Sequence, residues 1–303
     1  MVTRDPGVIR AILTATGDRD GQFDRDTLPS IGIARATGQD TLLFGNGPMW
    51  RRHRKVSAAP FGKTAVFQVD LFFEFEETFR RTVRQRLTTL RRHLLETGES
   101  RLQVALEPEI KALMLEMLVE CFFGTSIDYQ ELREVYVPAL ERVIDHIVRD
   151  TVTNQLGLPR SLLARVSRRY AQASRDLKTF EELTDRVMAT RSSRRGLWKK
   201  LRSEAPDTAL RNNVKVFLAG ALEATTSYAT WAISHLARNQ EWQQKVFREV
   251  EVMADFSPDQ LNGAENLRAV LDETLRLTPS LYFLPRKATV PSRIRTADGR
   301  EML

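Results

Sequence analysis

The chain has 303 residues, with 46 lysines and arginines against 39 aspartates and glutamates, which gives a formal net charge of +7. Its 42% of apolar residues is enough to build a core and excludes a disordered chain. A single cysteine excludes a disulfide scaffold, and we find neither a signal peptide nor an apolar stretch long enough to cross a membrane. The composition predicts an intracellular, soluble chain. We expect a cytoplasmic location, with a membrane anchor upstream of Met1 left open.

The N-terminal third of the chain alternates between helix and loop signals. Residues 5–14 predict a short helix with Pro6 in its first turn, where proline is tolerated. Residues 17–47 are rich in glycine and aspartate and predict a loop. Residues 49–93 predict a long helical stretch that is broken near residues 60–62.

Helical periodicity dominates the remainder. Apolar residues recur at helical spacing in residues 107–123, 138–152, 162–191, 206–253 and 265–277. Only residues 289–303 predict strands, two short ones joined by a turn at Asp298 and Gly299. The pattern therefore predicts a mainly α protein in one domain over residues 1–303, with minor β structure at its C-terminal end.

Basic residues gather in three runs that contain no acid, at residues 80–92, 159–175 and 191–202. Such runs favour a negatively charged partner, although each is also typical of a solvated helix face. No zinc-finger spacing and no aromatic nucleic-acid-binding pattern accompanies them, so we predict no nucleic-acid partner. The four histidines lack the spacing of a zinc hydrolase.

A first group of candidate residues is Trp50 and Arg54. They are four residues apart, so on a helix they share a face. The indole N–H and the guanidinium can then both donate hydrogen bonds to a carboxylate. Taken alone, this group is also typical of a basic surface helix.

A second group lies in residues 217–226, which read Phe-Leu-Ala-Gly-Ala-Leu-Glu-Ala-Thr-Thr. Gly220 in a helix interior costs about 1 kcal/mol relative to alanine, which favours the close approach of a bulky group. Glu223 and Thr226 follow one helical stripe, and Thr225 is next to it in sequence. The alternative is a buried helix whose threonines are satisfied within the core.

A third group is Glu273 and Arg276, which can pair within one helix, followed by Arg286 in the segment Leu-Pro-Arg. A lone Glu-x-x-Arg is common in exposed helices. In this order and spacing, however, the three groups together resemble the cytochrome P450 family along nearly the whole chain. The resemblance implies a partial P450 fold that binds haem (iron protoporphyrin IX).

The resemblance also implies roles for single residues. Trp50, Arg54 and Arg286 would contact the haem propionates, and Gly220 would lie against the haem. Glu223, with Thr225 or Thr226, would deliver protons. Glu273 and Arg276 would be a structural pair.

The chain departs from the family pattern in two places. Ala224 stands where the family has the first threonine of an acid-Thr-Thr segment, so a hydroxyl must come from a distorted helix at Thr225, from the substrate or from water. The family's Cys-ligand loop is absent, and we expect that metal ligand beyond Leu303, with further family structure before Met1. Cys121 lies in an apolar helical stretch and is expected to be a core thiol, so no metal ligand is assigned within the chain.

The function implied by the resemblance is a haem-dependent monooxygenase. It would insert oxygen from dioxygen into a small apolar organic substrate, with electrons from an acidic partner, a ferredoxin or a reductase. We expect the chain as given to be inactive, because a thiolate ligand favours O–O cleavage. The alternative is a non-enzymatic basic helical interaction module, a decayed relative of the family.

Overall fold

The computed structural model describes residues 3–15, 22–25, 31–38, 40–61, 69–189, 207–280 and 284–302. The basic run predicted at residues 191–202 lies outside these described residues. Within the described ranges, we find no helix that combines the length and the apolar character needed to cross a membrane.

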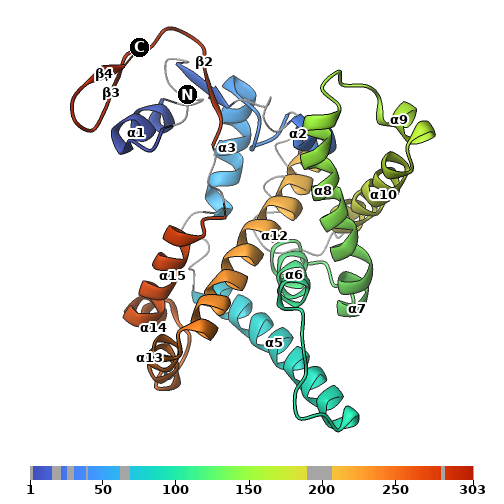
Figure 1. The fold of residues 1–303 in the computed structure, drawn as a ribbon, viewed down its shortest axis with the longest axis vertical. Coiled ribbons are helices and arrows are strands. Elements are labelled where there is room, and N and C mark those ends of the chain that lie inside the picture. The colour runs from blue at the N-terminus through green and yellow to red at the C-terminus, as the bar shows by residue number, and fades with distance from the viewer. Residues whose placement is uncertain are drawn as a thin grey trace.

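The described part is mainly helical (Figure 1). Its helices are α1 (Pro6–Thr14), α2 (Ile31–Thr37), α3 (Gly47–Phe61), α5 (Val69–Thr97), α6 (Leu106–Met117), α7 (Tyr129–Glu131), α8 (Val137–Thr153), α9 (Arg160–Val166), α10 (Arg168–Ala189), α12 (Asp207–Arg238), α13 (Gln240–Glu251), α14 (Pro258–Gly263) and α15 (Glu265–Leu277). Two π-helical turns, Leu118–Phe122 and Leu132–Tyr136, follow α6 and α7. The strands are β1 (Phe23–Arg25), β2 (Arg286–Ala288), β3 (Ile294–Arg295) and β4 (Glu301–Met302).

The core is built around α12, which runs through the middle of the molecule (Figure 1). Its residues Leu210, Val214, Leu218 and Leu222 recur every four positions and are at most 1% exposed. This spacing puts them on one face of the helix, where each contributes about 2 kcal/mol by leaving water. They form one apolar cluster with buried residues of α6, α8 and α10. The helices around α12 therefore fix the position of the motif that it carries.

Most of the predicted helices are confirmed, with two divisions that periodicity did not reveal. The run at residues 206–253 is divided at Asn239, whose φ of −123° and ψ of 79° interrupt the helix. The run at residues 162–191 is divided at Ser167, which adopts an extended conformation. Apolar spacing continues across both divisions, so spacing alone does not locate them.

The predicted terminal strands are confirmed, and they are joined by the predicted turn. β3 and β4 pair antiparallel, with Gly299 at a φ of 86° in the turn between them. The conformation at Gly299 is one that glycine adopts without strain. A second antiparallel pair, β1 and β2, joins the two ends of the described chain.

The prediction of a continuous loop at residues 17–47 was wrong, since α2 and β1 form there. Gly32 of α2 lies against α8 so closely that an added Cβ atom would be 2.1 Å from the carbonyl oxygen of Ile147. The amide N–H of Gly32 donates to the hydroxyl of Thr151 over 3.0 Å. Glycine therefore serves helix packing at this position and does not mark a loop.

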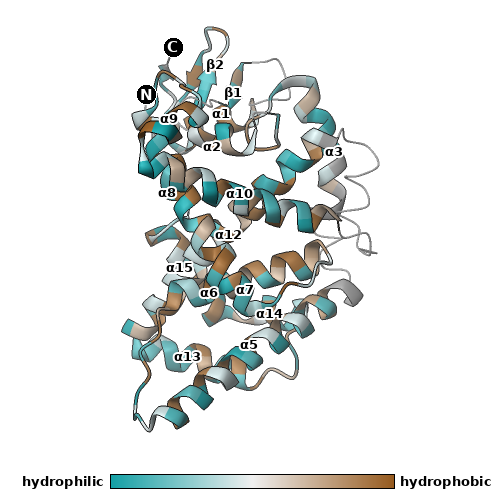
Figure 2. Cartoon of the chain, turned by 90° about the vertical axis from the view of Figure 1, so that its right-hand side faces the viewer, coloured by the Kyte–Doolittle hydropathy of each residue, from teal (hydrophilic) through white to brown (hydrophobic). Residues whose placement is uncertain are grey.

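The outer helices are amphipathic. Figure 2 shows hydrophobic and hydrophilic residues alternating along α5 and α13. In α5, Phe73, Phe79 and Leu87 are each more than 40% exposed. These helices thus present apolar side chains on the surface of the described part.

Candidate functional site

Arginines from three elements meet at the end of the molecule where α3, β1 and β2 lie (Figure 1). Trp50 and Arg54 are one turn apart on α3. Arg286 begins β2, and the antiparallel register places it directly opposite Arg25 of β1. Three of the residues predicted to contact haem, Trp50, Arg54 and Arg286, are therefore grouped with a fourth, Arg25, that the sequence motifs did not include.

Arg25 is held against the indole of Trp50. Its guanidinium carbon lies 4.0 Å from the centroid of the Trp50 ring, a cation–π arrangement, and its Nη1 donates to the carbonyl oxygen of Gly45 over 3.1 Å. The Trp50 N–H, which we expected to donate to a carboxylate, donates to the carbonyl oxygen of Leu42 over 3.1 Å. In this structure Trp50 therefore acts as a platform for a guanidinium.

Positive charge dominates this site. Among the described residues, no carboxylate forms an ion pair with Arg25 or with Arg54. Burial, together with the positive charges of Arg286 and Arg54, lowers the pKa of Arg25 to about 10. Burial also lowers the pKa of Arg286. Two half-buried guanidiniums beside an exposed one are suited to a ligand that brings carboxylates with it.

On α12, Gly220 lies on an open side of the helix. It is exposed, and a Cβ atom added to it would meet nothing within 4 Å. Ala221 and Thr225 are exposed as well, and the Thr225 hydroxyl donates to the carbonyl oxygen of Ala221. This stretch of helix therefore combines small side chains with one hydroxyl that is bound to the backbone.

Glu223 and Thr226 do not join Thr225 on that side. The Glu223 carboxylate lies 3.3 Å from the ammonium nitrogen of Lys111 in α6. Thr226 is fully buried, and its hydroxyl oxygen has no hydrogen-bond partner in the described structure. Residues 223 and 225 are separated by about 200° around a regular helix, so the predicted acid and the exposed hydroxyl point to different sides.

Ser280, which belongs to none of the three motif groups, contacts the backbone of Ala224, where the family pattern has a threonine. Its hydroxyl donates to the carbonyl oxygen of Ala224 over 2.9 Å. This bond ties the segment after α15 to the middle of α12. The only sequence signal for it is the neighbouring Pro279, which ends the preceding helix.

Glu273 and Arg276 form the predicted pair on α15. Two hydrogen bonds of 2.7 Å join the Glu273 carboxylate to the Arg276 guanidinium. Both side chains are more than half exposed, at 53% and 66%. The hydrogen bonds of the pair link two positions of one helix, and the hydrogen bond to Arg276, together with the charge of His235 in α12, lowers the pKa of Glu273.

Cys121 is a core residue, as predicted. It lies in the π-helical turn after α6 and is 1% exposed. Among the described residues we find no group of three or more histidine, cysteine, aspartate or glutamate side chains placed to hold a metal ion. Cys121 is therefore part of the packed core.

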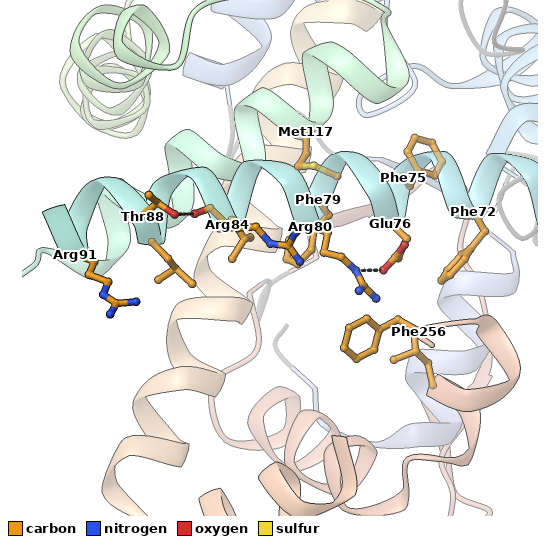
Figure 3. Close-up of a pocket in the computed structure, with 13 residues that line it drawn as sticks. Phe72, Phe75, Glu76, Phe79, Arg80, Arg84, Thr88, Arg91, Met117 and Phe256 are labelled. Atoms are coloured by element: carbon orange, nitrogen blue, oxygen red, sulfur yellow. Dashed lines mark hydrogen bonds and ion pairs between the residues drawn. The ribbon is translucent and has the colours of Figure 1, made fainter. Parts of the chain in front are cut away.

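A separate apolar groove of about 780 Å³ runs along α5. Figure 3 shows Phe72 on α5 and Phe256 facing it from below, with the ion pair of Glu76 and Arg80 between them. No motif residue lines this groove. The groove is therefore distinct from the site that Arg25, Arg54 and Arg286 form around Trp50.

The chain is similar to cytochromes P450 over almost its full length. The family model for cytochrome P450 matches residues 1–297. Cytochrome P450 4F5 of Rattus norvegicus is 24% identical over 98% of this chain and 59% of its own length. The self-sufficient cytochrome P450 monooxygenase CYP505E3 of Phanerodontia chrysosporium is 24% identical over 86% of this chain and 27% of its own length.

The fold shows the same similarity. The crystal structure of a cytochrome P450, CYP102L1, superposes with a TM-score of 0.74 at 17% identity and covers 98% of this chain and 67% of that structure. The chain spans about three fifths of the length of the rat relative. The family model, the fold and the order of the three motif groups along the sequence agree. The chain belongs to the cytochrome P450 family.

Proposed function

We propose that this chain is the haem-binding part of a monooxygenase that inserts oxygen from dioxygen into a small apolar organic substrate. Members of the cytochrome P450 family bind haem, and haem is the cofactor that family membership assigns to this chain. The observation that carries the proposal is the group of arginines around Trp50, in which neither Arg25 nor Arg54 is paired with an acid of the described residues. When bound, the haem supplies the activation of dioxygen.

The residues present fit the carboxylate edge of haem. Arg54 and Arg286 would bind its two propionates, because guanidiniums pair with carboxylates through two parallel hydrogen bonds. Gly220 would let the haem ring approach the α12 backbone, since no side chain occupies the space beside it. Trp50 would contact the same edge through its ring, as its N–H is engaged by Leu42.

Polar side chains of α12 would deliver protons. Thr225 is the exposed hydroxyl on that helix, and releasing its bond to the Ala221 carbonyl would let it hold a water molecule or a substrate group. Glu223 would act from the side that faces Lys111, through water. Thr226 is the weaker candidate, because its hydroxyl is buried away from solvent.

Electrons would come from an acidic partner, a ferredoxin or a reductase. Exposed arginines of α5 support this, although the basic run is partly neutralised: Arg81 is paired with Glu120 and Arg86 with Glu109. Arg84, Arg91 and Arg92 remain exposed. Rising ionic strength should slow electron transfer if such a surface guides docking.

The experiment compares three forms of the haem-loaded full-length protein of which this chain is proposed to be the haem-binding part, supplied with electrons and a panel of apolar substrates; the 303 residues alone are expected to form no product. Wild type should form hydroxylated product. Thr225→Val should form at least tenfold less product per electron consumed, whereas Thr226→Val should keep most of the wild-type yield. Equal yields from all three forms would contradict the role of Thr225, and the absence of product from wild type would contradict the proposed function.

A further inference from the structure

We propose that Asn213 of α12 is a positioning residue, which holds both the turn at residues 41–45 and helix α3 and so sets the place of the Trp50 indole relative to α12. The inference rests on the proposed function, because α3 and α12 both contribute residues to the proposed haem site. Asn213 belongs to none of the three motif groups. It lies about two turns before Gly220 on the same face of α12.

The side-chain oxygen of Asn213 holds the turn that precedes α3. Asn213 is 1% exposed, and its Oδ1 accepts from the amide N–H of Leu42 over 2.8 Å. The carbonyl oxygen of Leu42 in turn accepts from the indole N–H of Trp50 over 3.1 Å. The turn is closed by a bond of 2.7 Å from the amide of Gly45 to the carbonyl oxygen of Thr41. Leu42 therefore links α12 to the indole through its two backbone groups.

The side-chain nitrogen of Asn213 holds α3 itself. It lies 3.2 Å from Nδ1 of His53, a residue of α3 that is 4% exposed. Because Oδ1 is engaged by Leu42, the group that faces His53 is the NH2 group, which only donates. Nδ1 of His53 therefore accepts, and the ring is the neutral tautomer with its proton on Nε2. Burial and the charge of Arg52 lower the pKa of His53 against the opposing charge of Asp40, which favours this neutral form.

The two bonds of Asn213 reach Trp50 by separate routes. One passes through the turn, and the other passes through α3, where His53 and Trp50 are three residues apart and share a face. The bonds join residues that are 171 and 160 positions apart in the chain. A buried amide is costly when one of its bonds is lost, so this arrangement favours a single geometry. A ring held in this way keeps one orientation toward the proposed haem site.

The test follows Trp50 in the haem-free chain and then measures haem affinity through the Soret band. The chain has four tryptophans, and labelling with fluorotryptophan reports each of them in fluorine NMR; Trp50 gives the resonance that is lost in Trp50→Phe. Asn213→Leu removes both bonds, and Asn213→Asp keeps an acceptor for Leu42. The matched control is Asn154→Leu, because Asn154 is 4% exposed and holds Leu158 through two bonds of 3.0 and 2.8 Å.

We expect Asn213→Leu to shift the Trp50 resonance and to weaken haem binding about fivefold, the effect of one lost hydrogen bond. Asn213→Asp should restore the Trp50 resonance, because a carboxylate oxygen still accepts from Leu42. Its second oxygen faces Nδ1 of His53 and should raise the pKa of His53, followed by NMR of the labelled imidazole. Asn154→Leu should lose stability while keeping the wild-type Trp50 resonance and haem affinity, a separation that general destabilisation does not produce.

An unchanged Trp50 resonance in Asn213→Leu would overturn the inference, and so would a shifted resonance with wild-type haem affinity. Equal losses of haem affinity in Asn213→Leu and Asn154→Leu would assign Asn213 a purely structural role. Should Asn213→Leu fail to fold, a His53 that titrates in Asn213→Asp as it does in wild type would also refute the arrangement. If wild type binds no haem while Asn213→Leu still shifts the Trp50 resonance, the proposed function fails and the positioning of Trp50 by Asn213 is supported.

Discussion

The ammonium group of Lys111 lies 3.3 Å from the carboxylate of Glu223 and joins the motif of α12 to α6. Lys111 is buried, with 7% of its side chain exposed, and it also contacts Glu107 and Glu141 at 3.0 and 3.1 Å. Burial alone would lower the pKa of Lys111, but the bond to Glu107 and the charges of Glu223 and Glu141 raise it above its ordinary value. One cation therefore holds three acids from three helices.

Replacing Lys111 should destabilise the fold. Lys111→Met leaves three carboxylates without their shared cation, and we expect the free energy of unfolding to fall by about 2 kcal/mol. Urea unfolding followed by circular dichroism measures this change. The control Lys178→Met removes an exposed lysine and should cost less than about 0.5 kcal/mol. Equal effects of the two substitutions would show that the cluster does not hold the helices together.

The pH dependence of stability should reflect buried His146. Burial lowers the pKa of His146 below 6.5, and the positive charge of Arg160 lowers it further. Both ring nitrogens lack hydrogen-bond partners in the described structure, while Tyr170, Asp150, Asp145 and Arg169 surround the ring. Because the unfolded chain takes up this proton more readily than the folded one, the free energy of unfolding should decrease as pH falls below 6.5.

His146→Phe should therefore flatten the stability profile between pH 7 and pH 5. Thermal unfolding at several pH values measures the slope, and the exposed His93→Gln serves as control. His53 also has a lowered pKa, caused by burial and by Arg52, so part of the slope should persist in the variant. A slope that stays at its wild-type value in His146→Phe would contradict this assignment.

The pair of Glu273 and Arg276 should contribute little to the stability of this chain. Both side chains are more than half exposed, and surface ion pairs are screened by water. Glu273→Gln should leave the midpoint of urea unfolding within error of the wild-type value. A clear fall of that midpoint would mean that the pair holds a second element in place.

Cys121 should be irrelevant to haem binding. Its side chain is 1% exposed within the core. Cys121→Ala should cost about 1 kcal/mol of stability through lost packing and leave the haem absorption spectrum unchanged. Spectra of the ferrous carbon monoxide complex of both proteins provide the comparison, and a thiolate band that disappears in the variant would contradict the core assignment.

The helices could be predicted because the core imposes a periodicity that is visible in the sequence. Leu210, Val214, Leu218 and Leu222 show it most clearly. Helix α2 could not be predicted, because Gly32 is a helix-packing residue whose partner, Ile147, lies far along the chain. Local composition records neither the contact nor its distance in sequence.

One part of the site could be predicted from the sequence and another part could not. Trp50 and Arg54 share a helix face, so their spacing identified them. Arg25 could not be found in this way, because it reaches the site through the pairing of β1 with β2. The orientation of the Trp50 N–H toward Leu42 likewise depends on how the preceding loop folds back onto α3.

The measurement that tests the account most directly is a haem titration of the wild-type chain and of the double variant Arg54→Gln/Arg286→Gln, followed through the Soret band. If Arg54 and Arg286 bind the haem carboxylates, the Soret band of wild type should change saturably with one haem per chain. The double variant should bind haem at least tenfold more weakly. Identical titrations, or a wild-type chain in which haem absorbs as it does in buffer, would contradict the account.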